Sequence, residues 1–384
     1  MKKRVALLKL MLCGFILLPE YSSAQEGKFD DNNAITFNAS YIGDNVNIIS
    51  GGIKTGSCYL GLANFKLSFD TENASLWKGG QFFISAANTH GASPSSEFIG
   101  DLQVVSNIEA GNHTFVQELW YKQAFGKVEL TVGLQDLNVE LANTENGAHF
   151  LNSSFGILPT ISGNVPAPVY PLTSFGFSAR WTVSEKLSLN GALFDGCPTD
   201  FESNPYNLNW QLRSNDGLLA ISEMQYSTNI NMLPGTYKLG TYSHKLWFDK
   251  LIVENNDSLC TQNFGYYIIA DQMLWQADQR NINSFVQFGI SPEKYNENYF
   301  YMGTGVNYNG LFQKNGSDVL GIAIAIAGIK GNTKNESTLE LTYKTELTNY
   351  FFIQPDIQYV FNPAGYGEKL ANCLEGTLRF GLFF

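Results

Sequence analysis

The sequence predicts an all-β fold: a transmembrane antiparallel β-barrel of about 16 strands. Stretches of about ten residues with alternating polarity recur along the chain, which is the pattern of barrel strands. The connections between these stretches alternate between short turns and longer loops. The chain ends on EGTLRFGLFF, where Leu378, Phe380, Leu382 and Phe384 share one strand face. An edge strand of a soluble sandwich is the alternative for this ending, and the strand count favours the barrel.

Residues 1–24 are expected to be a secretory leader that is removed on export. Lys2, Lys3 and Arg4 precede an apolar stretch that ends near Leu18, and small residues lead up to Ala24. This order of a basic start, an apolar segment and a small-residue cleavage site is typical of such leaders. Residues 25–384 are then expected to form one barrel domain. They contain no apolar run of the ~18 residues that a spanning helix needs.

Sixteen segments have strand-like alternation. In VELTVGLQ, Val128 and Leu130 lie on one face, and Glu129 and Thr131 lie on the other. The predicted strands lie near residues 35–48, 57–70, 79–90, 113–125, 127–137, 174–184, 187–196, 217–227, 236–247, 263–276, 283–290, 298–308, 318–328, 337–346, 350–361 and 374–384.

The predicted strand at 318–328 has side chains of very different size on its two faces. Ile322 and Ile324 lie on one face, and Ala323 and Ala325 lie on the other. Small inward side chains suit a lumen that stays open. A strand packed against a second sheet is the alternative.

The connections suggest an orientation. Short turns fall at one end of the predicted barrel, the periplasmic end, and long loops such as 91–112 and 197–216 fall at the other, as in outer-membrane barrels. The longest loop, 138–173, contains four prolines, which exclude a regular interior strand. Its apolar residues predict that it folds into the lumen between the fifth and sixth strands and narrows it. An outer lid that packs on other loops is the alternative.

Charge and cysteine content exclude several classes of function. The net charge is −11, and removal of the basic leader makes the chain more acidic, so no nucleic-acid partner is expected. Cys58, Cys197, Cys260 and Cys373 are far apart and form no CxxC pair, so neither a metal site nor a cofactor is expected. Export permits disulfides, and four cysteines allow three pairings that remain open.

Eight segments, in this order, resemble the carbohydrate-selective porin family of bacterial outer membranes, often called OprB-like, over essentially the whole mature chain. They are GGIKTGSCYLG (51–61), WKGGQFFISAANTHG (77–91), EFIGDLQVVSNIEA (97–110), QELWYKQAFG (117–126), FLNSSFG (150–156), ALFDGCP (192–198), LPGTYKLGTY (233–242) and LELTYKTELTNYFFIQPDIQYVFNP (339–363).

The resemblance implies a sixteen-stranded barrel in the bacterial outer membrane that lets small sugars diffuse passively, as a monomer or a homotrimer. Outer-membrane lipid would surround it. By resemblance to outer-membrane proteins generally, the barrel-assembly machinery would read the aromatic ending at Phe384. Two departures put the sugar preference in doubt. The strand around 130–138 lacks the basic residue usual in the family, and Cys197 stands where an acidic residue often follows the glycine of the DGxP motif.

Sugars present hydroxyl groups and apolar C–H faces, so a sugar pore is expected to be lined by carboxylates, amides, arginine and aromatic rings that bind weakly at several points. Alternation, together with the long loop and the strand QELWYKQ, gives the candidate pore-lining residues. They are Glu129, Arg180, Glu223, Lys238, Glu118, Gln123, Asn152, Tyr170, Gln354 and Arg379. The alternation in QELWYKQ is mixed, so the facing of Glu118 and Gln123 stays open.

Arg180 is the most informative candidate. It lies opposite apolar side chains in FGFSARWTV, and an arginine facing lipid at mid-bilayer costs ~2 to 4 kcal/mol, so it should face the lumen. There it either contacts sugar or forms a structural ion pair with Glu129 or Glu223. Pro355 is the main conflict, because it cannot donate within a strand. A bulge there would shift the facing of Asp356 and Gln358.

Three other functions compete with a sugar-selective pore. A general diffusion porin would separate solutes only by size and charge. A structural barrel would have its lumen blocked by the long loop. An enzyme on a barrel is disfavoured, because the chain has only four histidines and contains neither GxSxG nor HExxH.

Overall fold

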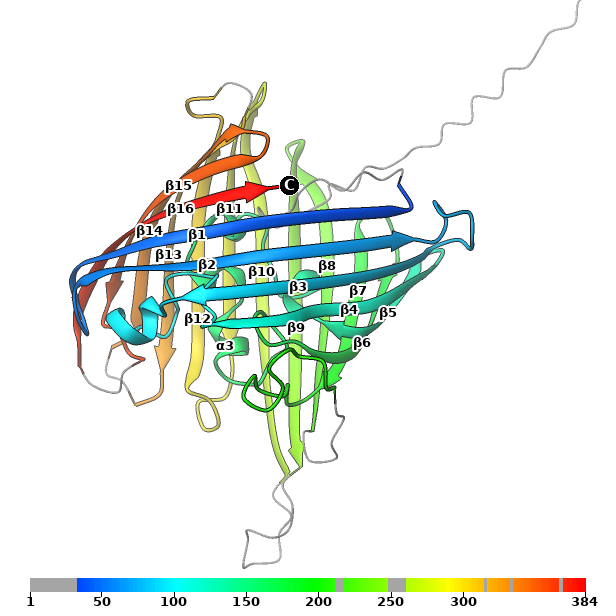
Figure 1. The fold of residues 1–384 in the computed structure, drawn as a ribbon, viewed down its shortest axis with the longest axis horizontal. Coiled ribbons are helices and arrows are strands. Elements are labelled where there is room, and N and C mark those ends of the chain that lie inside the picture. The colour runs from blue at the N-terminus through cyan, green and yellow to red at the C-terminus, as the bar shows by residue number, and fades with distance from the viewer. Residues whose placement is uncertain (1–32, 211–216, 248–259, 314–315, 332–333, 366–368) are drawn as a thin grey trace, which may run out of the picture.

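The 16 strands close into one antiparallel barrel in which β1 pairs with β16 (Figure 1). The computed structural model describes residues 33–210, 217–247, 260–313, 316–331, 334–365 and 369–384. The expected leader, residues 1–24, lies outside them. Every strand pairs with its neighbours in sequence, so the sheet is an up-and-down meander. Within the described ranges, no helix has the length and apolar character needed to cross a membrane.

Each predicted strand corresponds to an observed one, which confirms the predicted fold class. The strands are β1 (Ile35–Gly52), β2 (Gly56–Asp70), β3 (Gly80–Gly91), β4 (His113–Phe125), β5 (Val128–Gln135), β6 (Ser174–Thr182), β7 (Leu187–Asp195), β8 (Leu218–Ile230), β9 (Leu233–Trp247), β10 (Cys260–Ala277), β11 (Arg280–Ile290), β12 (Asn298–Asn309), β13 (Asp318–Ile329), β14 (Glu336–Thr348), β15 (Phe351–Phe361) and β16 (Ala371–Phe383). The short helices are η1 (Ser95–Ile99), α1 (Leu137–Glu140), η2 (Gly147–His149), α2 (Ser153–Gly156) and α3 (Pro159–Ser162).

The last strand shows how the two faces of the wall differ. Leu378 points outward and is 51 % exposed, and Phe384, after the strand, is 74 % exposed. Phe383 lies on the opposite face, where its ring stacks on Phe352 with the centroids 5.8 Å apart. The apolar outer row is therefore available to lipid, and the aromatic residue that breaks the alternation packs inside the barrel.

The connection between β5 and β6, residues 136–173, turns into the barrel and contacts the inner faces of β8, β10 and β14. Carboxylates of these strands accept backbone amides of the loop. Ala142 donates its N–H to Glu223 Oε2 of β8 at 2.9 Å. Leu151 and Asn152 donate theirs to Glu340 of β14 at 2.6 and 3.0 Å. Amide donors that would otherwise be buried without partners are thereby satisfied.

Further contacts fix the middle of this loop. Asp271 of β10 accepts the Thr144 hydroxyl at 2.7 Å and the Asn146 N–H at 3.0 Å. Phe150 and Phe155 are buried, with ring centroids 5.2 Å apart, in an apolar cluster shared with the wall. The alanines of β13 belong to that cluster, so their small side chains make room for the loop. The sequence had suggested instead that they keep the lumen open.

A second connection, residues 92–112 between β3 and β4, also turns inward, although the sequence placed it outside. Arg379 of β16 donates to both carboxylate oxygens of Asp44 of β1, at 2.7 and 2.8 Å. The loop joins this pair through Ser106, whose hydroxyl donates to Asp44 at 2.7 Å, and through Asn107, which accepts from Arg379 at 2.9 Å. Both charged side chains are nearly fully buried.

No bulge forms at Pro355. Gln354, Pro355 and Asp356 pair with consecutive residues of β16, with no register shift between them. Pro355 is exposed on the outer face, and Asp356 is buried on the inner one. The inward facing of Asp356 and Gln358 is therefore the one that simple alternation predicts.

No disulfide joins Cys58, Cys197 and Cys373 to one another. The side chain of Cys260 lies outside the described part of the structure.

Candidate functional site

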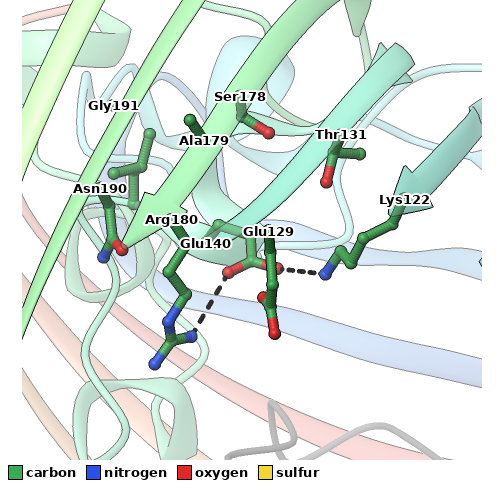
Figure 2. Close-up of a pocket in the computed structure, with 10 residues that line it drawn as sticks. Lys122, Glu129, Thr131, Glu140, Ser178, Ala179, Arg180, Asn190 and Gly191 are labelled. Carbon is green, nitrogen blue, oxygen red and sulfur yellow. Dashed lines mark hydrogen bonds and ion pairs between the residues drawn. The ribbon is translucent and has the colours of Figure 1, made fainter. Parts of the chain in front are cut away.

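A polar recess lies on the inner face of β4–β7, where α1 of the long loop approaches the wall (Figure 2). Lys122 comes from β4, Glu129 from β5, Arg180 from β6 and Asn190 from β7, and Glu140 comes from α1. Two cationic and two anionic side chains therefore meet beside an amide.

Strand register explains why these side chains meet. Glu129 pairs with Arg180, and Arg180 pairs with Asn190, so the three lie side by side across neighbouring strands. Directly opposed residues on one face of a sheet have Cβ atoms about 4.5 to 5.5 Å apart. Carboxylate, guanidinium and amide therefore form one row along the wall.

Glu140 joins the two cations of the recess. Its Oε1 lies 3.0 Å from Lys122 Nζ, and its Oε2 lies 3.8 Å from Arg180 Nη1. Burial raises the pKa of Glu140, but the charges of Lys122 and Arg180 outweigh it, so the net pKa lies below its ordinary value. Glu140 is therefore ionised at neutral pH. Asp136 positions α1 as its N-cap by accepting the Asn138 N–H at 2.9 Å.

An aromatic pair continues the inner wall next to the recess. Phe83 of β3 stacks on Trp120 of β4, with ring centroids 4.8 Å apart and planes at 23°. Lys122 Nζ lies 5.2 Å from the Trp120 ring. Both rings are half-buried, so the wall offers an apolar surface beside its charged groups.

The family model of the carbohydrate-selective porins of the OprB family matches residues 54–384. The chain belongs to this family. It is accordingly a sugar-preferring porin of the bacterial outer membrane, and not an enzyme.

Known proteins resemble this porin at low sequence identity. Porin B of Pseudomonas aeruginosa is 22 % identical over 412 residues, which cover 91 % of this chain and 87 % of the relative. The high-pH structure of Pseudomonas putida OprB matches with a TM-score of 0.81 at 18 % identity, covering 94 % of this chain and 100 % of the other. OmpF of Salmonella typhi, in complex with daunomycin, has a TM-score of 0.58 at 9 % identity, covering 93 % and 99 %. These structures share the fold of this porin.

Two of the ten residues predicted from the sequence line the recess: Glu129 and Arg180. Arg180 faces the lumen, as its placement among apolar residues indicated. Its ion-pair partner is Glu140 of the loop, and not Glu129 or Glu223 of the wall.

Most of the other predicted residues hold the inward loops in place. Three of them are Glu223, which binds Ala142, Lys238, whose Nζ donates to the Asn143 backbone oxygen at 2.8 Å, and Gln354, which donates to the His149 backbone oxygen at 2.8 Å. All three are nearly fully buried. Side chains committed to a loop in this way do not line an open path.

The same holds for the remaining anchors. Asn152 in the loop is fully buried and donates to Gln358 at 3.1 Å. Glu118 accepts the N–H of Asp136, at the start of the long loop, at 3.4 Å, and it also accepts from Trp120 Nε1 at 3.2 Å. The Tyr170 hydroxyl donates to the Ile108 backbone oxygen at 3.1 Å and so connects the two loops. Arg379 holds the second loop through Asp44 and Asn107.

Gln123 is the one predicted residue on the wrong face. It alternates with Lys122 and shares its face with Tyr121, whose ring packs on the outward Phe82 with centroids 4.6 Å apart. Gln123 accepts hydrogen bonds from Tyr121 and from Trp77 Nε1. It belongs to an outer aromatic belt at a strand end, where amphipathic side chains suit the membrane interface.

Lys122, Asn190 and Glu140 also line the recess but were not among the ten candidates selected from the sequence. Lys122 shares a strand face with Glu118 and Trp120, so a strict period of two would have placed it inside. Asn190 lies on the inward face of LSLNGAL. Glu140 had no sequence signal, because its position depends on how the loop folds. Lys122 and Arg180 also supply the basic groups that β5 lacks, since they flank it on β4 and β6.

The described ranges contain no cluster of metal-ligating side chains. No group of three or more His, Cys, Asp or Glu there could hold a metal ion. Burial, then the charge of Lys344, lowers the pKa of His149 to about 4. His90 lies beside Tyr41, with its Nε2 3.1 Å from the hydroxyl.

Glu145 is expected to make loop attachment depend on pH. Burial, then the charge of Asp271, raises its pKa from 4.5 to about 8. A raised carboxyl pKa favours the folded loop below the ordinary value, and this contribution is lost as the pH rises through about 8. We expect the single-channel current to become progressively noisier and larger as the pH rises from about 5 to about 8 in planar bilayers, and to change little above that range.

Glu145→Gln should remove this change, whereas Glu202→Gln, at an exposed position of another loop, should retain it. Identical pH profiles for the parent protein and Glu145→Gln would rule out this role of Glu145.

Proposed function

We propose that neutral sugars cross this porin along the inner wall of β4–β7, past Lys122, Glu129 and Arg180 of the wall and Glu140 of the loop. The observation that carries the proposal is a contrast in exposure along the inner wall. Arg180 and Glu140 are 36 % and 41 % exposed, whereas the loop anchors Glu223, Lys238 and Gln354 on β8, β9 and β15 are nearly fully buried.

Charge balance at the recess supports a neutral solute. Lys122 and Arg180 are offset by Glu129 and Glu140, so the recess presents donors and acceptors without net charge. Hydroxyl groups both donate and accept, and a conducting site must bind weakly enough to release its solute. The wall also offers the Phe83–Trp120 pair to the apolar faces of a sugar ring, as aromatic surfaces pack against C–H groups.

The two alternatives weighed from the sequence, a general diffusion porin and a barrel blocked by its loop, predict different measurements. Single-channel conductance in planar bilayers separates any porin from a blocked barrel. Proteoliposome swelling then separates the two kinds of porin. We expect sugar flux that saturates and is inhibited by a second sugar, and flux that scales with solute mass alone would eliminate sugar preference.

Arg180→Gln should weaken saturation by sugar while the channel still conducts, because the variant keeps a polar side chain of similar length. The matched control is Arg280→Gln, at an exposed position at the start of β11. Equal half-saturating concentrations for both variants and the parent protein would remove Arg180 from the sugar path.

Export and assembly complete the proposal. Residues 1–24 would be cleaved on export, and the barrel-assembly machinery would read the ending at Phe384. We place a homotrimer contact on the outer face of β1–β3, where Tyr41 contacts Tyr59 and His90 through hydrogen bonds. Exposed polar side chains of Asn45, Asn47 and Ser57 lie on the same face. Light scattering of the detergent-solubilised protein would tell a trimer from a monomer.

A further inference from the structure

Asn190 is a buried amide without a hydrogen-bond partner. Its side chain is 7 % exposed, and neither its Oδ1 nor its Nδ2 bonds to any residue that the structure describes. A buried polar group left unpaired costs about 1 to 3 kcal/mol, so such groups usually bind an ordered water or a ligand. Asn190 lines the recess, next to Arg180 (Figure 2).

The neighbours of Asn190 are already committed elsewhere. Glu223, which pairs with Asn190 from the neighbouring strand β8, accepts from Ala142 N at 2.9 Å and from the Tyr267 hydroxyl at 2.8 Å. Arg180, its partner across β6, is drawn toward Glu140. The amide therefore remains available to a group that enters the recess from the lumen.

The size of the recess limits what can enter. Its cavity volume is about 20 Å³, which holds one water molecule or one hydroxyl group but no sugar ring. An asparagine amide presents one acceptor and one donor group side by side. A hydroxyl group can accept from Nδ2 and donate to Oδ1, so it matches the vacant amide in both size and chemistry.

We propose that this recess is a subsite for a single protruding hydroxyl of a neutral sugar, and that Asn190 is a residue that sets the preference among sugars. The inference rests on the proposed sugar path along β4–β7. The ring remains in the lumen beside Arg180 and Glu129, and one hydroxyl enters the recess. A sugar that lacks this hydroxyl leaves the amide unpaired, which is the arrangement that best rejects an analogue.

The test is a series of monodeoxy hexoses that compete with the parent hexose for flux in proteoliposomes. In the unmodified protein, we expect one deoxy position to raise the half-inhibitory concentration roughly 2- to 12-fold, the effect of one net hydrogen bond. Asn190→Leu, which has a similar shape without polar atoms, should abolish the difference between that deoxy sugar and its parent. Asn190→Ala should also abolish this difference, and its short side chain leaves the recess open.

Asn64→Leu is the matched control. Asn64 lies on β2 outside the recess, and its Oδ1 is likewise buried without a partner among the described residues. This variant should retain the discrimination between the two sugars. Single-channel conductance of each variant establishes that it is folded and open.

The outcomes separate this inference from the proposed function. Saturable sugar flux that is indifferent to every deoxy position, or that keeps its discrimination in Asn190→Leu and Asn190→Ala, would overturn the subsite and leave the sugar path intact. If the Asn190 variants lost flux equally for hexoses, deoxy sugars and ions, the recess would hold only a structural water and the subsite would be overturned. Flux that never saturates in the unmodified protein would overturn both proposals.

Discussion

Replacing Arg379 with methionine is expected to destabilise the barrel by about 3 to 5 kcal/mol, the usual cost of removing one partner of a buried ion pair. The change leaves the Asp44 carboxylate buried with the Ser106 hydroxyl and without its cation. It also removes the bond to Asn107, so loop 92–112 loses an anchor. The free energy of unfolding can be measured by urea titration in detergent, followed by tryptophan fluorescence.

A double variant separates the charge effect from general damage. Asp44→Leu together with Arg379→Met should recover much of the loss, because an apolar pair of similar volume often replaces a buried ion pair without cost. Arg280→Met, at an exposed position, should unfold like the parent protein. If Arg379→Met also unfolds like the parent, the pair does not hold the two ends of the sheet and the loop together.

Replacing Phe155 with alanine should detach the long loop from the wall and raise the single-channel conductance. The ring is fully buried and lies 5.2 Å from Phe150 and 5.7 Å from Phe285 between centroids. Truncation of a buried phenylalanine costs about 3 to 5 kcal/mol. The substitution therefore destabilises the attachment of the loop, whereas the strands of the barrel keep their hydrogen bonds.

The control for this prediction is Phe177→Ala on β6, because Phe177 is 45 % exposed on the outer face. It should leave the conductance unchanged. We expect a larger and noisier current in Phe155→Ala. The barrel should still remain folded in detergent when the sample is not heated. An unchanged current would mean that the loop is held by its hydrogen bonds alone.

The strands could be predicted from the sequence because a closed barrel gives each residue only two possible surroundings. Lipid selects an apolar side chain, and the interior selects a small or polar one, so a period of two appears in each strand. The expected conflict at Pro355 did not arise. Its side chain points outward, and its pairing with β16 is continuous. On the β14 side the pairing stops after Thr342–Asp356 and resumes at Thr345–Ile353 in the same register, so the missing N–H costs a short gap and no bulge.

The functional site was harder to predict, because facing the interior is different from facing the open path. Glu223, Lys238 and Gln354 all face inward, yet each is buried by a loop anchored far away in sequence. Strand alternation contains no information about where a loop will settle. Glu140 illustrates the same limit, since its contacts with Lys122 and Arg180 depend on the fold of the loop.

The attachment of the long loop through main-chain donors has an evolutionary consequence. Ala142, Leu151 and Asn152 meet Glu223 and Glu340 with their peptide nitrogens, and every amino acid except proline has that donor. Selection can therefore rewrite the side chains that border the passage while the grip of the wall persists. New solute preferences become accessible through single substitutions, without the invention of a new scaffold.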